Sequence, residues 1–200
     1  MPQKNAVKFQ QNLAWLMIEV MFGRAHYGIA RGLGRSDRRA IKAFGTAPRF
    51  FDLTLGAHAD SAQLALARIF DRTSAVSIHT LLSSALKEAG TFKHGTSMEV
   101  RKAVERAKAS IATLEPGVTA IRTRRNETIA HLDARPFIDP NGYVQEGLVS
   151  YRQIEGLFDQ IGAILNTLSL LYRGASSPLE LEGAKDYEQV LDHLADTTEN

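Results

Sequence analysis

The chain carries its densest set of chemically reactive side chains between residues 122 and 131. Within these ten positions lie Arg122, Arg124, Arg125, Asn126 and His131. Arginine presents a planar, permanently charged fork that binds phosphate oxygens in pairs, and histidine exchanges protons near neutral pH. These residue types at this spacing suggest a site where arginine and histidine converge on a phosphate.

A structural role for the same segment is the alternative. On a helix, Arg125 falls on the apolar face, and its charge then needs a partner because an isolated buried charge is very costly. In this interpretation Arg124 pairs with Glu127 or Glu115, and Arg125 extends its charge to the solvent. His131 becomes an ordinary histidine near a helix C-terminus, where the helix dipole favours it. Spacing alone favours this structural role, since arginine–histidine pairs on helices are common.

The elements that must position these residues are predicted to be helical, because apolar residues repeat with a helical period along nearly the whole chain. Serines that can begin helices, and glycines or prolines that end or break them, set the boundaries. The predicted helices span residues 5–33, 37–72 with an interruption at Pro48, 78–89, 97–132 with a break at Pro116, 150–172 and 186–195. The serines expected at their starts are Ser36, Ser77, Ser97 and Ser150.

A small hairpin is the one predicted departure from helix. Asn141-Gly142 is a strong turn signal, and the flanking residues of the segment Phe137–Val144 could pair as two short strands. Several long helices with short loops describe a bundle. We therefore predict an all-α, up-and-down helical bundle with a short C-terminal helix.

Length and composition fit one domain in a reducing compartment. A chain of 200 residues, 44% of them hydrophobic, can bury a single core. The sequence has no cysteine, which excludes disulfides, thiolate metal sites and a cysteine nucleophile. The longest apolar stretch, residues 13–22, contains Glu19 and is shorter than the roughly 20 residues that cross a bilayer. We expect no membrane span and a cytoplasmic location.

Charge divides the chain near residue 173. The net charge is +2, but residues 174–200 carry seven acidic side chains and one lysine, so this tail holds −6 and residues 1–173 hold +8. We therefore distinguish a bundle, residues 1–173, from an acidic tail, residues 174–200, with a short amphipathic helix. A basic body with an acidic tail suggests a polyanionic partner or a tail that folds over a basic surface, unless both surfaces are simply solvated.

The segment RNETIAH, residues 125–131, resembles the R-x(4–6)-H motif of the HEPN superfamily of helical domains. A polar residue often follows the motif arginine, and Asn126 occupies that place. The longer run RNETIAHLD resembles the branch associated with bacterial abortive-infection proteins. Upstream, residues 64–72 and the pair Leu81-Leu82 resemble the second helix of that branch and the short helix after it.

This resemblance implies a metal-independent endoribonuclease of a bacterial defence or toxin–antitoxin system. The ribose 2′-hydroxyl would attack the adjacent phosphodiester, with His131 as acid or base, Arg125 as phosphate clamp and Asn126 as an orienting hydrogen-bonding group. Arg122 and Arg124 are further candidates for RNA binding. The resemblance implies a homodimer with RNA as substrate, no metal and no cofactor, and leaves room for an antitoxin or regulatory protein as partner.

The resemblance carries an alternative function, and three features of the sequence bear on the site that it implies. Some superfamily members are non-catalytic, so the alternative is a dimeric HEPN-like interaction module. On a straight helix Arg125 and His131 point about 120° apart, so they converge only where the helix bends or ends. Arg124 shares the face of His131 better. Asp133 stands where partners of nucleotidyltransferase antitoxins often carry a tyrosine, so regulation through such a tyrosine is not expected.

Overall fold

The computed structural model describes residues 2–35, 37–126 and 149–197, with side chains for most of them. Within this part of the chain all regular structure is helical, which confirms the all-α prediction. The elements are α1 (Pro2–Leu33), α2 (Arg38–Thr46), α3 (Pro48–Ile69), α4 (Ile78–Lys87), the 3-10 turn η1 (Ala89–Thr91), α5 (Ser97–Thr113), α6 (Glu115–Arg124), α9 (Tyr151–Arg173) and α10 (Asp186–Thr197). The hairpin predicted within Phe137–Val144 lies outside the described residues.

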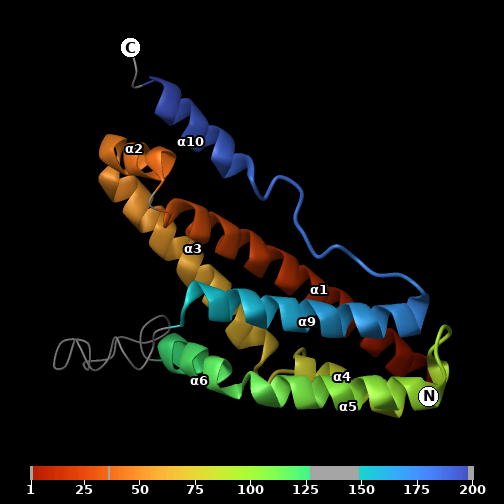
Figure 1. Ribbon diagram of the computed structural model, residues 1–200. Coiled ribbons are helices and arrows are strands. Elements are labelled where there is room, and N and C mark those ends of the chain that lie inside the picture. Colours follow the sequence, from red (N-terminus) through yellow and green to blue (C-terminus); the bar gives the residue numbers. More distant parts are fainter. Residues whose placement is uncertain (1, 36, 127–148, 198–200) are drawn as a thin grey trace.

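The bundle is built around α1, which packs along α3 on one side and α9 on another (Figure 1). Helix α4 packs on α1 and α5, and α5 also contacts α9. Helix α6 continues from α5 and reaches α3 as well as α9. None of the helices in the described ranges is long and apolar enough to cross a bilayer.

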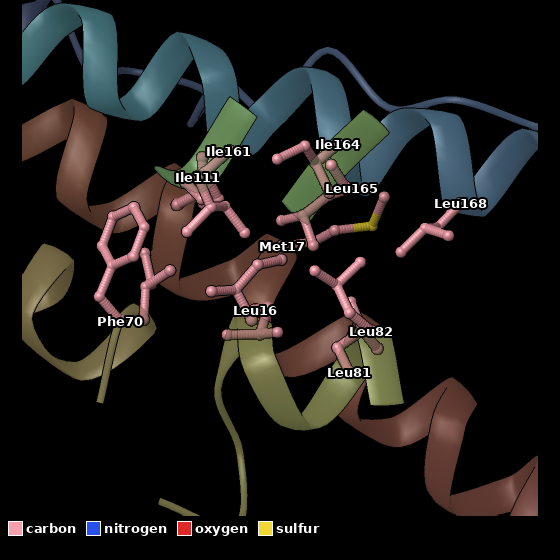
Figure 2. Close-up of a cluster of buried hydrophobic side chains, with 14 of the residues drawn as sticks. Leu16, Met17, Phe70, Leu81, Leu82, Ile111, Ile161, Ile164, Leu165 and Leu168 are labelled. Carbon is pink, nitrogen blue, oxygen red and sulfur yellow. The ribbon is translucent and has the colours of Figure 1, made fainter. Parts of the chain in front are cut away.

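A single large core lies between these helices. Figure 2 shows side chains from α1, α4, α5 and α9 meeting in it, together with Phe70 from the end of α3. Helix α1 buries Leu13, Leu16, Met17, Val20 and Tyr27 there. Burying such side chains removes apolar surface from water, worth roughly 1.5–3 kcal/mol each, so the core holds the helices in fixed register.

The helix starts are the main local corrections. Ser77 and Ser150 cap α4 and α9 as predicted. Helix α2, however, is capped by Asp37, whose carboxylate accepts a hydrogen bond from the Ala40 amide, while Ser36 lies outside the described residues. Helix α5 does begin at Ser97, but its cap is Thr96, because only Thr96 stands three residues before Glu99 and can form a reciprocal capping box.

Both prolines break the chain where expected. Pro48 stands at the start of α3 and separates it from α2 at Ala47. Pro116 stands in the first turn of α6, and the break falls just before it at Leu114. Proline is tolerated in a first helical turn because its missing amide would be unpaired there anyway. The second break turns α6 away from α5 and towards α3.

The acidic tail folds back along the bundle. Gly174 ends α9 with φ +74°, and the Asn166 side chain then exchanges two hydrogen bonds with the Ser177 backbone, of 2.8 and 2.9 Å. Leu179 is buried at 2% exposure. The chain runs back to α10, which packs on α2 (Figure 1). A second, small core seals this contact: Leu33, Ala43, Phe51 and Leu191.

Candidate functional site

Helix α6 carries the arginine-rich segment and is anchored by its apolar residues. Val118 and Ile121 are buried against the main core, at 3% and 1% exposure. The helix ends at Arg124, and Arg125 and Asn126 continue in a wider, π-type turn. Such turns change the direction of the side chains that follow and are frequent at functional sites. The change of geometry falls at the first residue of the HEPN-like motif.

Arg125 is held by two neighbours. Its Nη1 lies 3.5 Å from Asp71 Oδ2, and its Nε donates a 2.9 Å hydrogen bond to Asn126 Oδ1. The Arg125 and Asp71 side chains are each 29% exposed, so the pair lies at the surface but is largely enclosed. Asn126 is therefore in direct contact with the Arg125 guanidinium.

Asp71 itself is fixed by a local turn. Its Oδ1 accepts hydrogen bonds from the Thr73 amide at 2.9 Å and the Thr73 hydroxyl at 2.7 Å. These two bonds, and then the charge of Arg125, lower the pKa of the Asp71 carboxyl below its ordinary value. The turn also explains why α3 stops at Ile69 rather than continuing to Arg72 as predicted. Competition of an aspartate side chain for backbone amides is a common way to end a helix.

Arg124 faces a different carboxylate from the one expected. Its Nη2 donates a 3.0 Å hydrogen bond to Asp60 on α3, not to Glu115, while Glu127 lies outside the described residues. The Arg124 Nε is buried and has no hydrogen-bond partner. The pair joins α6 to the middle of α3. Arg124 and Arg125 therefore each pair with a carboxylate from the α3 region, Arg124 with Asp60 and Arg125 with Asp71.

Glu115 and Arg122 of α6 belong to a third group, together with Arg72 in the turn after α3 and His79 on α4. Glu115 pairs with Arg122 at 3.8 Å and with Arg72 at 3.4 Å. His79, half-buried on α4, lies within their field. Burial lowers the pKa of His79 most, the charges of Arg72 and Arg122 lower it further, and Glu115 raises it. His79 is therefore largely neutral at pH 7, a state in which it can accept a proton.

Sequence analysis did not select His79, Asp71 or Asp60 as site residues. They lie more than forty residues before the motif, and only the fold brings Asp60 and Asp71 beside Arg124 and Arg125, and His79 near Arg122. A usable signal was present nonetheless, because Asp71-Arg72 ends the segment that resembles the second HEPN helix. His131, the predicted acid or base, lies outside the described residues.

An exposed apolar stripe on α1 borders this site. Trp15, Ile18 and Phe22 are 62%, 42% and 50% exposed and fall within about 60° of one another around the helix. Trp15 also lines a surface cavity of about 320 Å³ together with Asp71, the partner of Arg125. Large exposed apolar side chains that share one helix face mark an interaction surface. The stripe therefore adjoins the candidate phosphate clamp.

Two of the described histidines contact each other. His26 on α1 and His58 on α3 face each other with their Nδ1 atoms 2.7 Å apart. Burial, and then the neighbouring imidazole, lower the pKa of His58. Across the ranges that the structure describes, no three potential metal ligands of the His, Cys, Asp or Glu type gather in one place.

Comparison with known proteins yields one clear result. The sequence model of the family HEPN_AbiU2, described as AbiU2, matches residues 7–192. No curated protein and no solved structure is detectably similar to the chain. The match covers the bundle and extends into the acidic tail as far as Asp192. The resemblance of the motif at Arg125 predicted the same superfamily and its abortive-infection branch. The chain therefore belongs to the AbiU2 family of HEPN domains.

Proposed function

We propose that this HEPN domain is a metal-independent endoribonuclease that acts in bacterial defence as a homodimer. The observation that carries the proposal is the pair of contacts that fixes the Arg125 side chain. Its guanidinium is fixed by Asp71 and Asn126 at the point where α6 ends, and it lies at the surface beside an exposed apolar stripe. A fixed but accessible guanidinium is what stabilisation of a pentavalent phosphorane requires.

The proposed reaction needs few groups. A base removes the proton of the ribose 2′-hydroxyl, and the 2′-oxygen attacks the adjacent phosphorus. The bond from phosphorus to the 5′-oxygen breaks, and an acid protonates that oxygen. The products are a 2′,3′-cyclic phosphate and a 5′-hydroxyl. His131 supplies a proton-transfer group, Arg125 stabilises the charge on the phosphorane, and Asn126 orients Arg125.

The apolar stripe of α1 is the proposed dimer surface. Trp15, Ile18 and Phe22 would pack against the same residues of a second copy, because an isologous interface is self-complementary. The stripe borders the cavity that Asp71 lines, so a second copy placed there brings its own motif close to the first. Two basic segments would then line one RNA-binding cleft. RNA, and an antitoxin or regulatory protein, are the proposed partners.

A non-catalytic HEPN interaction module is the second candidate. It is favoured by the ion pairs of the described arginines, because Arg122, Arg124 and Arg125 each face a carboxylate of their own chain. Arginines used in this way hold helices together without any substrate. In this case the apolar stripe would be the functional surface, and the motif would only support the bundle.

An RNA cleavage assay separates the two candidates. Purified protein is incubated with structured and unstructured RNAs in EDTA, and the new ends are analysed for 2′,3′-cyclic phosphate. Arg125→Lys should lower cleavage at least tenfold, because a point charge does not replace a two-pronged hydrogen-bond donor. Arg106→Lys, on the exposed face of α5, is the matched control and should cleave like the wild type. Cleavage that is equal in both variants would remove Arg125 from the site.

A further inference from the structure

The helix α10 and the surface that it covers carry opposite charges. Helix α10 and its first turn are acidic, with Asp186, Glu188, Asp192 and Asp196. The neighbouring part of the bundle is basic: Arg39 and Lys42 of α2 contact α10, and Arg38 of α2 and Arg49 at the start of α3 are exposed. Figure 1 shows α10 lying alongside α2 at the end of the bundle. The acidic tail thus folds over a basic surface, one of the two arrangements that the charge distribution suggested.

Two contacts show that α10 uses groups that could bind phosphate. Arg39 Nη1 donates a 2.9 Å hydrogen bond to Asp192 Oδ1, and Lys42 Nζ donates a 2.6 Å bond to the Ala195 carbonyl oxygen. A carboxylate and a carbonyl at these positions imitate two oxygens of a nucleic-acid backbone. While α10 is docked, each of the two cations has a partner on it, with which another anion must compete.

The apolar part of this contact is small. Of the α10 side chains that the structure describes, Leu191 alone is buried, at 3% exposure, whereas Val190 is 54% exposed. Tyr187 adds its ring against Gly32 of α1. Besides Leu191, the partly buried Tyr187 and Leu194 pack on the small core, and the Arg39 ion pair and the Lys42 hydrogen bond add polar contacts. This contact is smaller than the core between the bundle helices, so the docking of α10 is weaker and can be reversed.

An exposed aromatic side chain indicates which polyanion the uncovered surface fits. Phe50 follows Arg49 at the start of α3 and is 62% exposed. Its ring lies against Phe51 at a centroid distance of 5.1 Å, so it is supported from behind. Cations beside an exposed, supported aromatic ring are typical of single-stranded nucleic-acid binding, where bases stack on the ring and cations track the backbone.

We propose that α10 is a displaceable cover of a single-stranded RNA-binding surface formed by Arg38, Arg39, Lys42 and Phe50. The proposal deepens the proposed function, on which it rests for the identity of the polyanion. In the closed state Asp192 occupies the place of a phosphate on Arg39. In the open state the surface holds an RNA strand. The acidic tail therefore lowers the affinity of the enzyme for RNA by direct competition.

Two variants of the full chain open the cover in different ways. Leu191→Ala removes the buried anchor and should raise the open fraction at least about tenfold, because such truncations cost well over one factor of ten in equilibrium. Apparent affinity rises with that fraction until the open state dominates. Asp192→Asn removes only the competing charge and should raise affinity up to about fivefold, as expected for an exposed ion pair. Val190→Ala and Glu105→Gln are the controls for size and net charge.

The measurement combines RNA binding with hydrogen exchange. Fluorescence anisotropy with a labelled single-stranded RNA gives the affinity, in a background of Arg125→Lys so that cleavage does not intervene. Amide exchange over residues 186–197 reports the opening of α10 directly. Adding Arg38→Ala, Arg39→Ala and Lys42→Ala to Leu191→Ala should abolish the gain. It should also lower the salt slope by about 2, because single-stranded binding contributes about 0.7 per phosphate contact.

The outcomes separate this proposal from the proposed function. Faster exchange in α10 with tighter RNA binding supports the cover. Faster exchange with unchanged RNA affinity overturns it, and wild-type cleavage in that case leaves the nuclease intact. Tighter binding without any cleavage by the chain that retains Arg125 supports the cover and overturns the nuclease. A gain that survives removal of the three cations also overturns the cover, since the RNA then binds elsewhere.

Discussion

Two glycines of α1, one turn apart, offer a sharp test of how α10 is held. A Cβ added at Gly28 meets no other atom within 4 Å, whereas one added at Gly32 would lie 2.2 Å from the Tyr187 hydroxyl oxygen and 2.3 Å from its Cε2. Gly28→Ala and Gly32→Ala therefore add the same methyl group to the same helix. They differ in whether the tyrosine ring at the start of α10 can keep its place.

The expected magnitudes follow from helix propensity and from the clash. Alanine is favoured over glycine in a helix interior by about 0.5–1 kcal/mol, so Gly28→Ala should stabilise the protein by that amount. Gly32 lies next to the last residue of α1, and its gain is no larger. There the tyrosine ring must also swing away, which costs about 1 kcal/mol or more of packing. We therefore expect Gly32→Ala to melt roughly 2–4 °C below Gly28→Ala.

Calorimetry and hydrogen exchange give the readouts. Gly32→Ala should speed amide exchange over residues 186–197, because Tyr187 no longer anchors the start of α10. Gly28→Ala should leave that exchange unchanged and raise the melting temperature. If both variants gain the same stability, with α10 protected equally, the contact between Tyr187 and Gly32 does not hold the tail and the reasoning is refuted.

Three further predictions concern the site, the histidines and the apolar stripe. Asp71→Asn keeps the hydrogen bond from the Thr73 amide but loses the charge that holds Arg125. RNA cleavage should therefore fall about tenfold, while the free energy of unfolding changes by less than about 1 kcal/mol. A variant that loses its fold together with its activity would contradict this. Burial lowers the pKa of His58 and of His79, so the unfolded chain binds more protons than the folded one. Stability should therefore be complete above about pH 6.5 and decrease as the pH drops below it. A urea midpoint that is as high at pH 5.5 as at pH 7.5 would refute this. Trp15→Arg should convert a dimer to a monomer in light scattering, whereas Leu53→Arg, 72% exposed on α3, should not; a monomeric wild type would rule out the proposed interface.

Much of the fold could be predicted because its signals are local. Apolar residues at helical spacing marked the long helices, and Pro48 and Pro116 marked the two breaks. The caps were off by one residue where two candidates stood side by side. At Thr96 the spacing to Glu99 decides between them, since a capping box needs residues three apart. The spacing of Thr96 and Glu99 in the sequence therefore already contains the signal for the cap.

The contacts of the candidate site could be predicted far less well. Arg124 was expected to pair within its own helix, but its partner Asp60 is 64 residues away. The partner of Arg125 is Asp71, which lies two residues after the end of α3. Local spacing contains no information on such pairs, because they depend on how α6 packs across α3. His79 could not be predicted to lie near Arg122 for the same reason, since only the fold brings α4 close to that arginine.

The reaction itself is the central claim, and His131 tests it most directly. Wild-type protein and the variant His131→Ala are compared for RNA cleavage in EDTA, with His94→Ala, an exposed histidine before α5, as the control. The account predicts cleavage by the wild type and the control, new 2′,3′-cyclic phosphate ends, and a loss of roughly 10²–10⁴-fold in His131→Ala at unchanged thermal stability. Wild-type protein that leaves every RNA intact, or a His131→Ala variant that cleaves at the wild-type rate, would contradict it.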